Sequence, residues 1–248
     1  MTHIDYDSIA EIYDLYVTAD HDVAFFVTEA TAAGGPVLEL TAGTGRLSLP
    51  LVEVGVELTC VDSSQGMLDV LSRKLAQRGL HAEVYCADVR RLGLPARFTL
   101  AILPFQSFME IVGEADQRAA LVAIHGCLVP GGRFICTLHN PAVRRSQVDE
   151  RLRVVGRFPT PEGTLVVSGF EQGGDPVVTR LQFFECFDGE GQLQQKRLLP
   201  MEFALVEREA FASMAEAAGF RVVELYGDYD GSPFDPERSP VMIWVLER

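Results

Sequence analysis

Apolar residues follow two alternating patterns along most of this chain: short continuous runs, and positions spaced three or four residues apart. The runs predict buried strands, and the spaced positions predict amphipathic helices. The expected strands lie near 37–41, 57–61, 82–87, 98–104, 133–139, 221–226 and 241–246, and the expected helices near 46–54, 64–78, 115–127 and 207–218. This alternation predicts an α/β fold, a doubly wound, seven-stranded, mostly parallel sheet with helices on both faces.

Two segments fall outside the alternation. Near the N-terminus, Ser8-Ile-Ala-Glu11 is a capping-box pattern, and the helix it would begin is followed by a second helix over 20–33. The segment 142–205 is too long for an ordinary connection and carries strand patterns with a turn at 188–191. We therefore expect an antiparallel β elaboration that lies over the mouth of an active site at the edge of the sheet. The chain then forms one domain, made of N-terminal helices (1–33), a core (34–141), the elaboration (142–205) and a C-terminal helix with strands (206–248).

The residues between the first two strands indicate a ligand site. The segment Val37-Leu-Glu-Leu-Thr-Ala-Gly-Thr-Gly45 is a strand followed by a glycine turn, and Asp62 ends the next apolar run. Glycines admit close backbone approach, and a carboxylate at that strand end can accept hydrogen bonds from two ribose hydroxyls. A dinucleotide fold would place a third glycine near Ser48. The pattern therefore favours another adenosine-bearing ligand.

Two later motifs follow in order along the chain. Asp88 comes after the third strand pattern, and Pro130-Gly131-Gly132 precedes the fifth. Together with Glu39–Gly45 and Asp62, this ordered set resembles the class I S-adenosylmethionine-dependent methyltransferases, and the leading helix and long insertion resemble the small-molecule, natural-product type of that family. The resemblance covers about residues 5–140. It implies S-adenosyl-L-methionine as the cofactor and S-adenosyl-L-homocysteine as the product.

On this resemblance, the turn residues Thr41, Ala42, Gly43 and Gly45 contact the methionyl end of the cofactor. Thr41 departs from the family, which often has glycine there. Glu39 lies inside an apolar strand, where an unpaired carboxylate is costly, so we expect it to pair with backbone donors of the turn or with the cofactor ammonium. A tight strand-to-helix turn without a ligand is the alternative.

The adenosine half of the site is expected at the next two strand ends. Asp62 is the ribose acid by position, with Ser63 beside it, although Asp62 could instead cap the following helix. Met67 on that helix faces either adenine or the core. The resemblance implies that Asp88 accepts from the adenine amino group and that the Val89 N–H donates to a ring nitrogen; a solvated loop aspartate is the alternative.

Methyl transfer is an in-line displacement at a sulfonium carbon, so the enzyme must align the acceptor, exclude water and remove a proton where the acceptor carries one. Leu103 near the fourth strand end is a further cofactor-binding candidate, and Phe105 and Gln106 after it are expected to border the methyl group. His139, next to Asn140 after the fifth strand, is the candidate general base near neutral pH. A structural, hydrogen-bonding histidine is the alternative.

The N-terminal helix carries Tyr13 and Tyr16 on one face with Ile9 and Ile12. It resembles the leading helix of small-molecule members of the family, which closes over the cofactor, and Tyr13 is then the better cofactor contact. An amphipathic helix packed permanently on the domain is the alternative.

Composition restricts the partners and the compartment. The 248 residues are 48% hydrophobic, and no apolar run or N-terminal signal pattern predicts a membrane partner or export, so a cytoplasmic monomer or homodimer is expected. The chain has 21 basic and 35 acidic residues, and the net charge of −14 disfavours nucleic acid. Its five cysteines lack zinc-ligand spacing, which predicts buried free thiols and no metal.

These patterns predict S-adenosylmethionine-dependent methyl transfer to an oxygen, nitrogen or carbon of a small-molecule acceptor. Two other functions use the same motifs: a non-catalytic S-adenosylmethionine-binding module, and an aminopropyl transferase on the same fold. Asp62 and Asp88 would bind the ligand in all three cases. They therefore do not discriminate among these functions.

Overall fold

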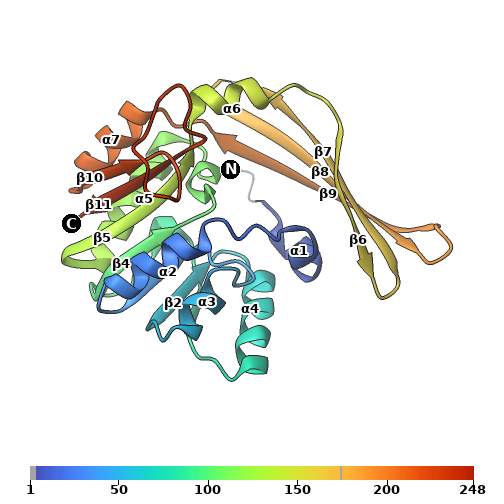
Figure 1. Ribbon diagram of the computed structural model, residues 1–248, viewed down its shortest axis with the longest axis horizontal. Helices are drawn as coiled ribbons and strands as arrows, with labels where there is room; N and C mark the ends of the chain where they lie inside the picture. The colour runs from blue at the N-terminus through green and yellow to red at the C-terminus, as the bar shows by residue number, and fades with distance from the viewer. Residues whose placement is uncertain (1–3, 174) are drawn as a thin grey trace.

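The computed structural model describes residues 4–173 and 175–248. The first three residues of the predicted N-terminal segment lie outside the described residues. Figure 1 shows an α/β core from which a long, curved antiparallel sheet extends to one side. Within the described residues, no helix is long and apolar enough to cross a membrane.

The core is a seven-stranded sheet of order β10-β11-β5-β4-β1-β2-β3. Its strands are β1 (Val37–Leu40), β2 (Leu58–Asp62), β3 (Glu83–Cys86), β4 (Phe98–Leu103), β5 (Leu128–His139), β10 (Arg221–Tyr226) and β11 (Val241–Glu247). Only β11 runs antiparallel to its neighbours in this sheet of described residues, which confirms the predicted mostly parallel sheet. Strand order reverses between β1 and β4, the place where ligands bind in such sheets.

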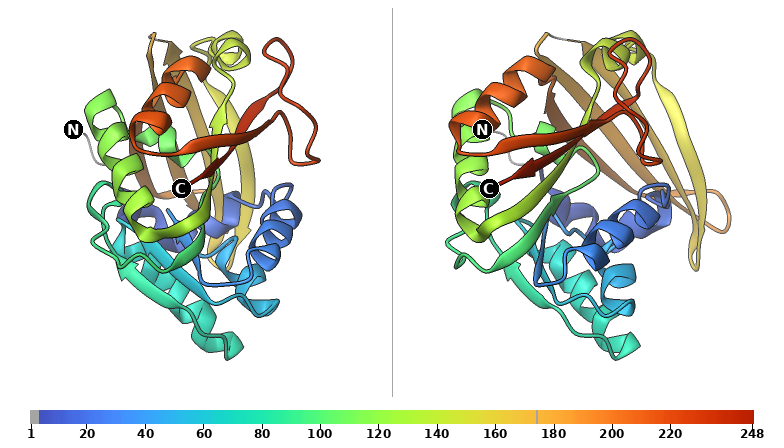
Figure 2. Two further views of the ribbon diagram at one scale, coloured as in Figure 1. Left: turned by 90° about the vertical axis from the view of Figure 1, so that its left-hand side faces the viewer. Right: turned by 60° about the vertical axis from the view of Figure 1, so that its left-hand side comes forward.

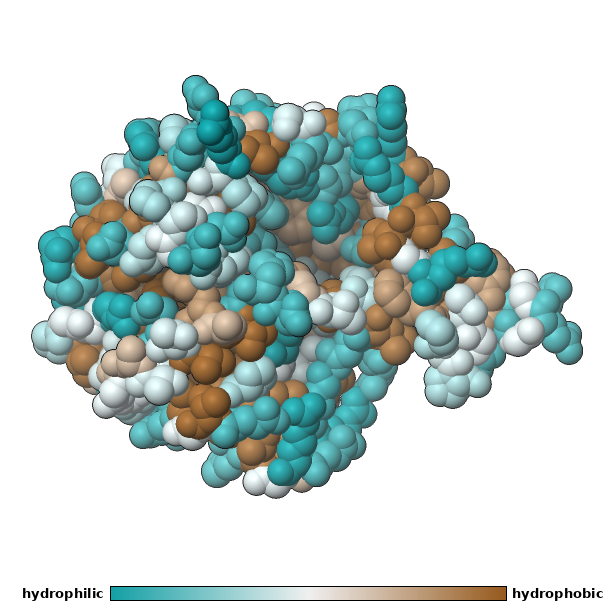
Figure 3. All heavy atoms as spheres, in the orientation of Figure 1, coloured by the Kyte–Doolittle hydropathy of each residue, from teal (hydrophilic) through white to brown (hydrophobic). Residues whose placement is uncertain are grey.

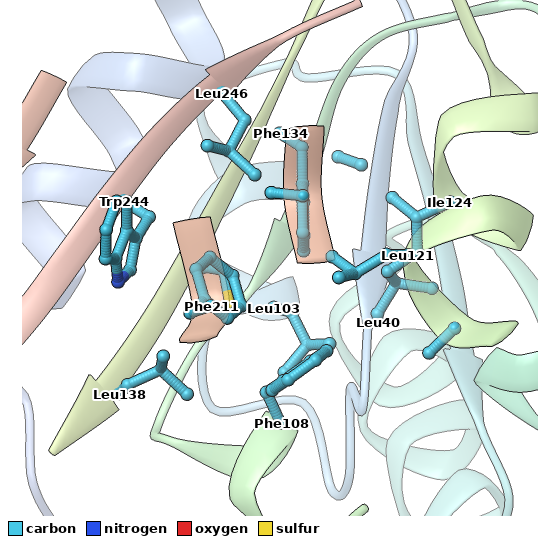
Figure 4. Close-up of a cluster of buried hydrophobic side chains, with 14 of the residues drawn as sticks. Leu40, Leu103, Phe108, Leu121, Ile124, Phe134, Leu138, Phe211, Trp244 and Leu246 are labelled. Carbon is cyan, nitrogen blue, oxygen red and sulfur yellow. The ribbon is translucent and has the colours of Figure 1, made fainter. Parts of the chain in front are cut away.

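Helices cover both faces of this sheet, as predicted (Figures 1 and 2). The helices are α2 (Val23–Ala32), α3 (Ser48–Glu53) and α4 (Gln65–Arg78) on one face, and α5 (Glu114–Cys127) and α7 (Arg208–Ala217) on the other. Alternation along β1 explains the two faces, because Val37 packs with Phe26 of α2 while Leu38 packs in the cluster that contains Leu121 of α5 and Phe211 of α7. Figure 4 shows the second cluster.

The predicted elaboration is a second, four-stranded antiparallel sheet of order β6-β7-β8-β9, which we call the outer sheet. Its strands are β6 (Arg153–Thr160), β7 (Gly163–Gly173), β8 (Val177–Asp188) and β9 (Leu193–Ala204), and α6 (Pro141–Gln147) precedes them. The turn at 188–191 is confirmed, since the Asp188 carboxylate accepts the Glu190 and Gln192 N–H groups. Neither α6 nor β6 was predicted, because most residues of β6 are exposed and show no apolar alternation.

Two local predictions are wrong. Ser8 does not cap a helix: Asp5 caps the 3₁₀ helix η1 (Tyr6–Ile9), and α1 (Ala10–Tyr16) begins after it without a side-chain cap. The cysteines are all free, but they are not all buried. Cys86 is exposed because β3 is an edge strand, and Cys186 is partly exposed.

The ring of Trp244 on β11 packs against Phe211, with 5.0 Å between ring centroids. Trp244 is 2% exposed, and its indole N–H has no hydrogen-bond partner among the described residues. An unpaired buried donor costs about 1–3 kcal/mol, which offsets part of what the indole contributes by packing.

We therefore expect Trp244→Phe to change the free energy of unfolding by less than about 1 kcal/mol, because the smaller ring also removes the unpaired donor. Phe211→Leu is the control, since it shrinks the neighbouring ring without removing a polar group, and should cost about 1–2 kcal/mol. Urea denaturation measures both. Equal losses in the two variants would contradict the prediction.

Candidate active site

A cavity of about 580 Å³ lies between the carboxyl ends of the parallel strands and the outer sheet. Figure 3 shows the hollow between these two parts of the surface. Its size is that of small-molecule sites, about 300–1,000 Å³. Nine of the predicted residues line it: Tyr13, Thr41, Gly43, Asp62, Ser63, Met67, Phe105, Gln106 and His139. The other six predicted residues are not among its described lining residues: Glu39, Ala42, Gly45, Asp88, Val89 and Leu103.

Asp62, the last residue of β2, connects the glycine turn to the next helix. One carboxylate oxygen accepts the Gly43 N–H and the other accepts the Ser64 N–H, both at 2.8 Å. Burial raises the pKa of Asp62, and these backbone donors lower it in part. A carboxylate offers about four lone-pair positions, so Asp62 can still accept from ribose hydroxyls. The residues present therefore fit an adenosine-bearing cofactor.

The capping alternative for Asp62 is wrong, because Ser64 caps α4 with its hydroxyl, which accepts the Met67 N–H at 3.2 Å. Met67 packs in the core beside the cavity, and its contact with adenine stays a prediction. It is 2% exposed and packs with Ile9 and Ala10, yet it also lines the cavity.

Glu39 does not make the expected bonds to the glycine turn. Its buried carboxyl accepts the Ser48 hydroxyl at 2.6 Å and lies 3.9 Å from the Cys60 sulfur, whereas the Gly43 N–H goes to Asp62. Burial raises the pKa of Glu39 to about 7. Glu39 thus connects β1 to the start of α3, and a cofactor contact for it stays a prediction.

Three residues beside the cavity have left-handed backbone conformations although none is glycine. Thr41 has φ 55°, Phe105 φ 56° and Gln106 φ 59°. Such conformations are costly for residues with a Cβ and cluster at functional sites. Thr41 therefore keeps the backbone shape that glycine gives other family members. The Gln106 N–H donates to the Thr137 hydroxyl at 3.0 Å, which supports the Phe105–Gln106 turn.

Gly45, Ala42 and Leu103 lie behind the residues that line the cavity and are closely packed. Gly45 has φ 91°, and a Cβ there would lie 2.4 Å from the Leu71 Cδ1 atom of α4. Ala42 and Leu103 are buried, with 5% and 0% of their surfaces exposed. Glycine at position 45 thus serves close packing of turn and helix.

Asp88 is partly exposed, in line with the alternative of a loop aspartate, but it has local partners. It caps the 3₁₀ helix η2 (Val89–Arg91), accepting the Arg90 N–H at 2.9 Å and the Arg90 Nε at 2.8 Å. The guanidinium of Arg90 holds the pKa of Asp88 below its usual value. An adenine contact for Asp88 and Val89 stays a prediction.

The N-terminal segment lines the cavity and contacts both α4 of the core and the outer sheet. The Asp7 carboxylate accepts the Ser64 hydroxyl at 2.6 Å and the Gly66 N–H at 2.7 Å at the start of α4. The Tyr13 ring packs edge-on against Tyr16, which in turn packs on Phe184 of the outer sheet with 5.2 Å between centroids. This placement fits a lid, and movement of the helix stays a prediction.

His139, the last residue of β5, does not fit a general base near neutral pH. Burial and the positive charges of Arg144 and Arg180 lower the pKa of His139 to about 4. Such an imidazole holds a proton weakly at pH 7. Asn140 next to it is structural, because its amide donates to the carbonyls of Pro236 and Ser239.

Glu110 is a cavity residue that the sequence patterns missed. It ends the 3₁₀ helix η3 (Ser107–Glu110), lines the cavity, and accepts the Tyr6 hydroxyl at 2.9 Å. Burial raises the pKa of Glu110 to about 7, and the charge of Asp62 adds to this rise, while the bond from Tyr6 and the charge of Arg180 lower the pKa. No motif marks this acid, because it lies in an irregular connection and its hydrogen-bond partner is 104 positions away in the sequence.

Arg46 was also missed, although it directly follows Gly45. Its Nη2 donates to the fully buried Asp22 at 2.7 Å, and its guanidinium lies over the Phe105 ring, 4.7 Å from the centroid. Arg46 thus connects the glycine turn to the strained residue that borders the cavity. The sequence alone does not reveal this pair, because Arg46 and Asp22 are 24 residues apart and belong to no shared motif.

Comparison with known proteins agrees with this geometry. Residues 37–132 match a family described as methyltransferase domain. The cypemycin N-terminal methyltransferase of a Streptomyces species is 28% identical over 236 residues, 91% of this chain and 88% of the relative. The CcbJ methyltransferase structure from Streptomyces caelestis superposes with TM-score 0.82 at 25% identity, covering 99% of this chain and 98% of that one. The S-adenosylmethionine-bound amino pentose methyltransferase CalS10 of Micromonospora echinaspora has TM-score 0.73 at 17% identity, covering 100% and 98%, a likeness of fold.

Fold, motifs and these similarities define an enzyme of the S-adenosylmethionine-dependent methyltransferases. More narrowly, these similarities support the class I, small-molecule type that the sequence resembles, with S-adenosyl-L-methionine as the cofactor.

The strain at Thr41 can be tested directly. Thr41→Gly should raise the free energy of unfolding by about 1 kcal/mol, because glycine adopts a φ of 55° without the Cβ clash. Thr41→Ala keeps the Cβ and should gain less. Guanidinium denaturation compares the two. A loss of stability in Thr41→Gly would show that the 2.6 Å bond from the Thr41 hydroxyl to the Leu40 carbonyl outweighs the strain.

Proposed function

We propose that this methyltransferase methylates an amine nitrogen of a small-molecule acceptor, and that Glu110 takes the proton that the amine loses. The carrying observation is a carboxyl group in the cavity wall, bonded to Tyr6, whose pKa of about 7 lies near physiological pH. A base with such a pKa suits proton transfer at neutral pH. The carboxylate also attracts an ammonium group before the proton leaves.

An amine that binds as an ammonium group gives one proton to the Glu110 carboxylate, and the neutral amine that remains attacks the methyl group as the bond from this group to the sulfonium sulfur breaks. The pKa of His139, about 4, makes it the weaker base of the two cavity residues. The name of the similar N-terminal methyltransferase also refers to a position that carries an amine in a free peptide. These points favour nitrogen over oxygen or carbon.

The cofactor supplies an electrophilic methyl group when bound. In this proposal Asp62 accepts from its ribose hydroxyls, and the turn from Thr41 to Gly45 faces its methionyl part. Phe105 and Gln106 border the methyl group, and the aromatic face of the N-terminal helix excludes water. Further cofactor contacts are proposed for Glu39, Ser63, Met67, Asp88, Val89 and Leu103.

The acceptor enters from the side of the outer sheet, since the strand ends of the core are taken by the cofactor. His139 lines this side as a neutral imidazole and positions the acceptor through a hydrogen bond. The cytoplasmic location, the monomeric or dimeric state and the exclusion of nucleic acid remain predictions.

Asp62→Ala should weaken S-adenosylhomocysteine binding at least about tenfold, because two hydroxyl donors lose their acceptor in a closed site. Asp69→Ala is a matched control, since Asp69 is an exposed acid on α4. Calorimetry on folded variants measures both. Unchanged affinity in Asp62→Ala would remove the ribose assignment.

Glu110→Gln should lower turnover of amine acceptors by about 100-fold or more, with S-adenosylhomocysteine affinity within about twofold. Turnover of the unmodified enzyme should rise as pH passes through about 7, where Glu110 loses its proton. This rise should disappear in Glu110→Gln. In Tyr6→Phe it should move to higher pH, because the Tyr6 bond lowers the pKa of Glu110.

A panel of primary and secondary amines with labelled S-adenosylmethionine gives these rates. His139→Gln is the control and should keep the rise near pH 7. Full turnover in Glu110→Gln, or methylation of alcohols in preference to every amine, would overturn the proposal.

A further inference from the structure

The cavity is electrically polarised. Two acids, Asp62 and Glu110, are the charged residues that the core contributes to its described lining. The opposite wall, formed by the outer sheet and the segment leading into it, contributes four arginines and two acids: Arg144, Arg151, Arg153, Arg180, Asp149 and Glu171. This positive excess occurs in a chain with a net charge of −14, so it does not reflect average composition.

The most buried part of this wall is a cluster of two arginines around one carboxylate. Arg180 pairs with Glu171 Oε1 through Nε, at 2.7 Å, and through Nη2, and Arg144 pairs with Glu171 Oε2. The side chains of Arg144 and Glu171 are 10% and 16% exposed, whereas that of Arg180 is 39% exposed. One carboxylate cannot satisfy the donors of two guanidiniums, so the cluster keeps a net positive charge and available N–H groups on Arg180.

Arg180 is held in place for such a contact. Its guanidinium lies over the ring of Phe203, 5.3 Å from the centroid, and Phe203 also lines the cavity. The charge of the cluster reaches the end of β5, because Arg144 and Arg180 both lower the pKa of His139. A planar, oriented guanidinium is the group that binds carboxylates and phosphates through two parallel hydrogen bonds.

We propose that the acceptor carries a negatively charged group, a carboxylate or a phosphate, and that Arg180 binds this group at the outer-sheet wall of the cavity. The inference rests on the proposed function, in which the amine of the same acceptor lies at the acidic end near Glu110. The acceptor then carries both an amine and an anion, which face the acidic and the basic walls of the cavity. The two sites lie within electrostatic reach of each other, because Arg180 also lowers the pKa of Glu110.

Binding of simple anions tests the site without knowledge of the acceptor. The S-adenosylhomocysteine complex is titrated with inorganic phosphate and with succinate at constant ionic strength, and binding is followed by calorimetry. At least one anion should bind, and Arg180→Gln should weaken that binding at least about tenfold. Arg180→Lys should keep part of it, since the charge remains without the planar fork.

Arg157→Gln is the matched control, because Arg157 is an exposed arginine of β6 outside the described cavity lining and the charge change is the same. It should bind the anions within about twofold of the unmodified protein. Arg180→Gln should remain folded, since Arg144 still pairs with Glu171. No binding of either anion, or equal binding in Arg180→Gln, would overturn the inference.

Paired acceptors then separate this inference from the proposed function. Each pair is an amino acid and its amide, or an aminoalkyl phosphate and the corresponding amino alcohol. A preference for the anionic member that is at least about tenfold and disappears in Arg180→Gln supports the inference. Equal methylation of both members overturns the inference but leaves amine methylation standing, whereas methylation of no amine, with anion binding intact, overturns only the proposed function.

Discussion

The site depends on the two backbone hydrogen bonds that the Asp62 carboxylate accepts. This carboxylate accepts one N–H from the glycine turn and one from the start of α4, and so fixes two loops at the switch point of the sheet. Ser64 extends this connection, because its hydroxyl donates to Asp7 of the N-terminal segment. The cofactor turn and the covering helix therefore share one point of attachment.

The two walls of the cavity carry opposite charge. At the core wall, the charge of Asp62 raises the pKa of Glu110. A cationic sulfonium or an ammonium nearby would lower that pKa again, because it stabilises the ionised carboxylate. The arginines of the outer sheet make the opposite end attractive to anions. A chain with excess negative charge thus has a net positive wall in this cavity.

The strands of the core could be predicted from the sequence because buried parallel strands appear as continuous apolar runs, and the motif residues lie at the ends of these runs. Asp62, Phe105 and His139 meet at one edge for that reason. The sequence was insufficient where the structure depends on long-range contacts. Glu110 accepts a hydrogen bond from Tyr6, which is far away in the sequence. The residues of β6 are mostly exposed, and this strand forms by pairing with β7.

The bond from Tyr6 to Glu110 joins the covering helix to the proposed base. While the N-terminal segment lies over the cavity, the Tyr6 hydroxyl lowers the pKa of Glu110 and keeps part of the population ionised near pH 7. If the segment moved away, that donor would be lost, but water would enter and remove the desolvation that raises the pKa. A covered site thus combines a dry environment with a hydrogen bond to the ionised carboxylate, and both are needed to place its pKa near neutrality.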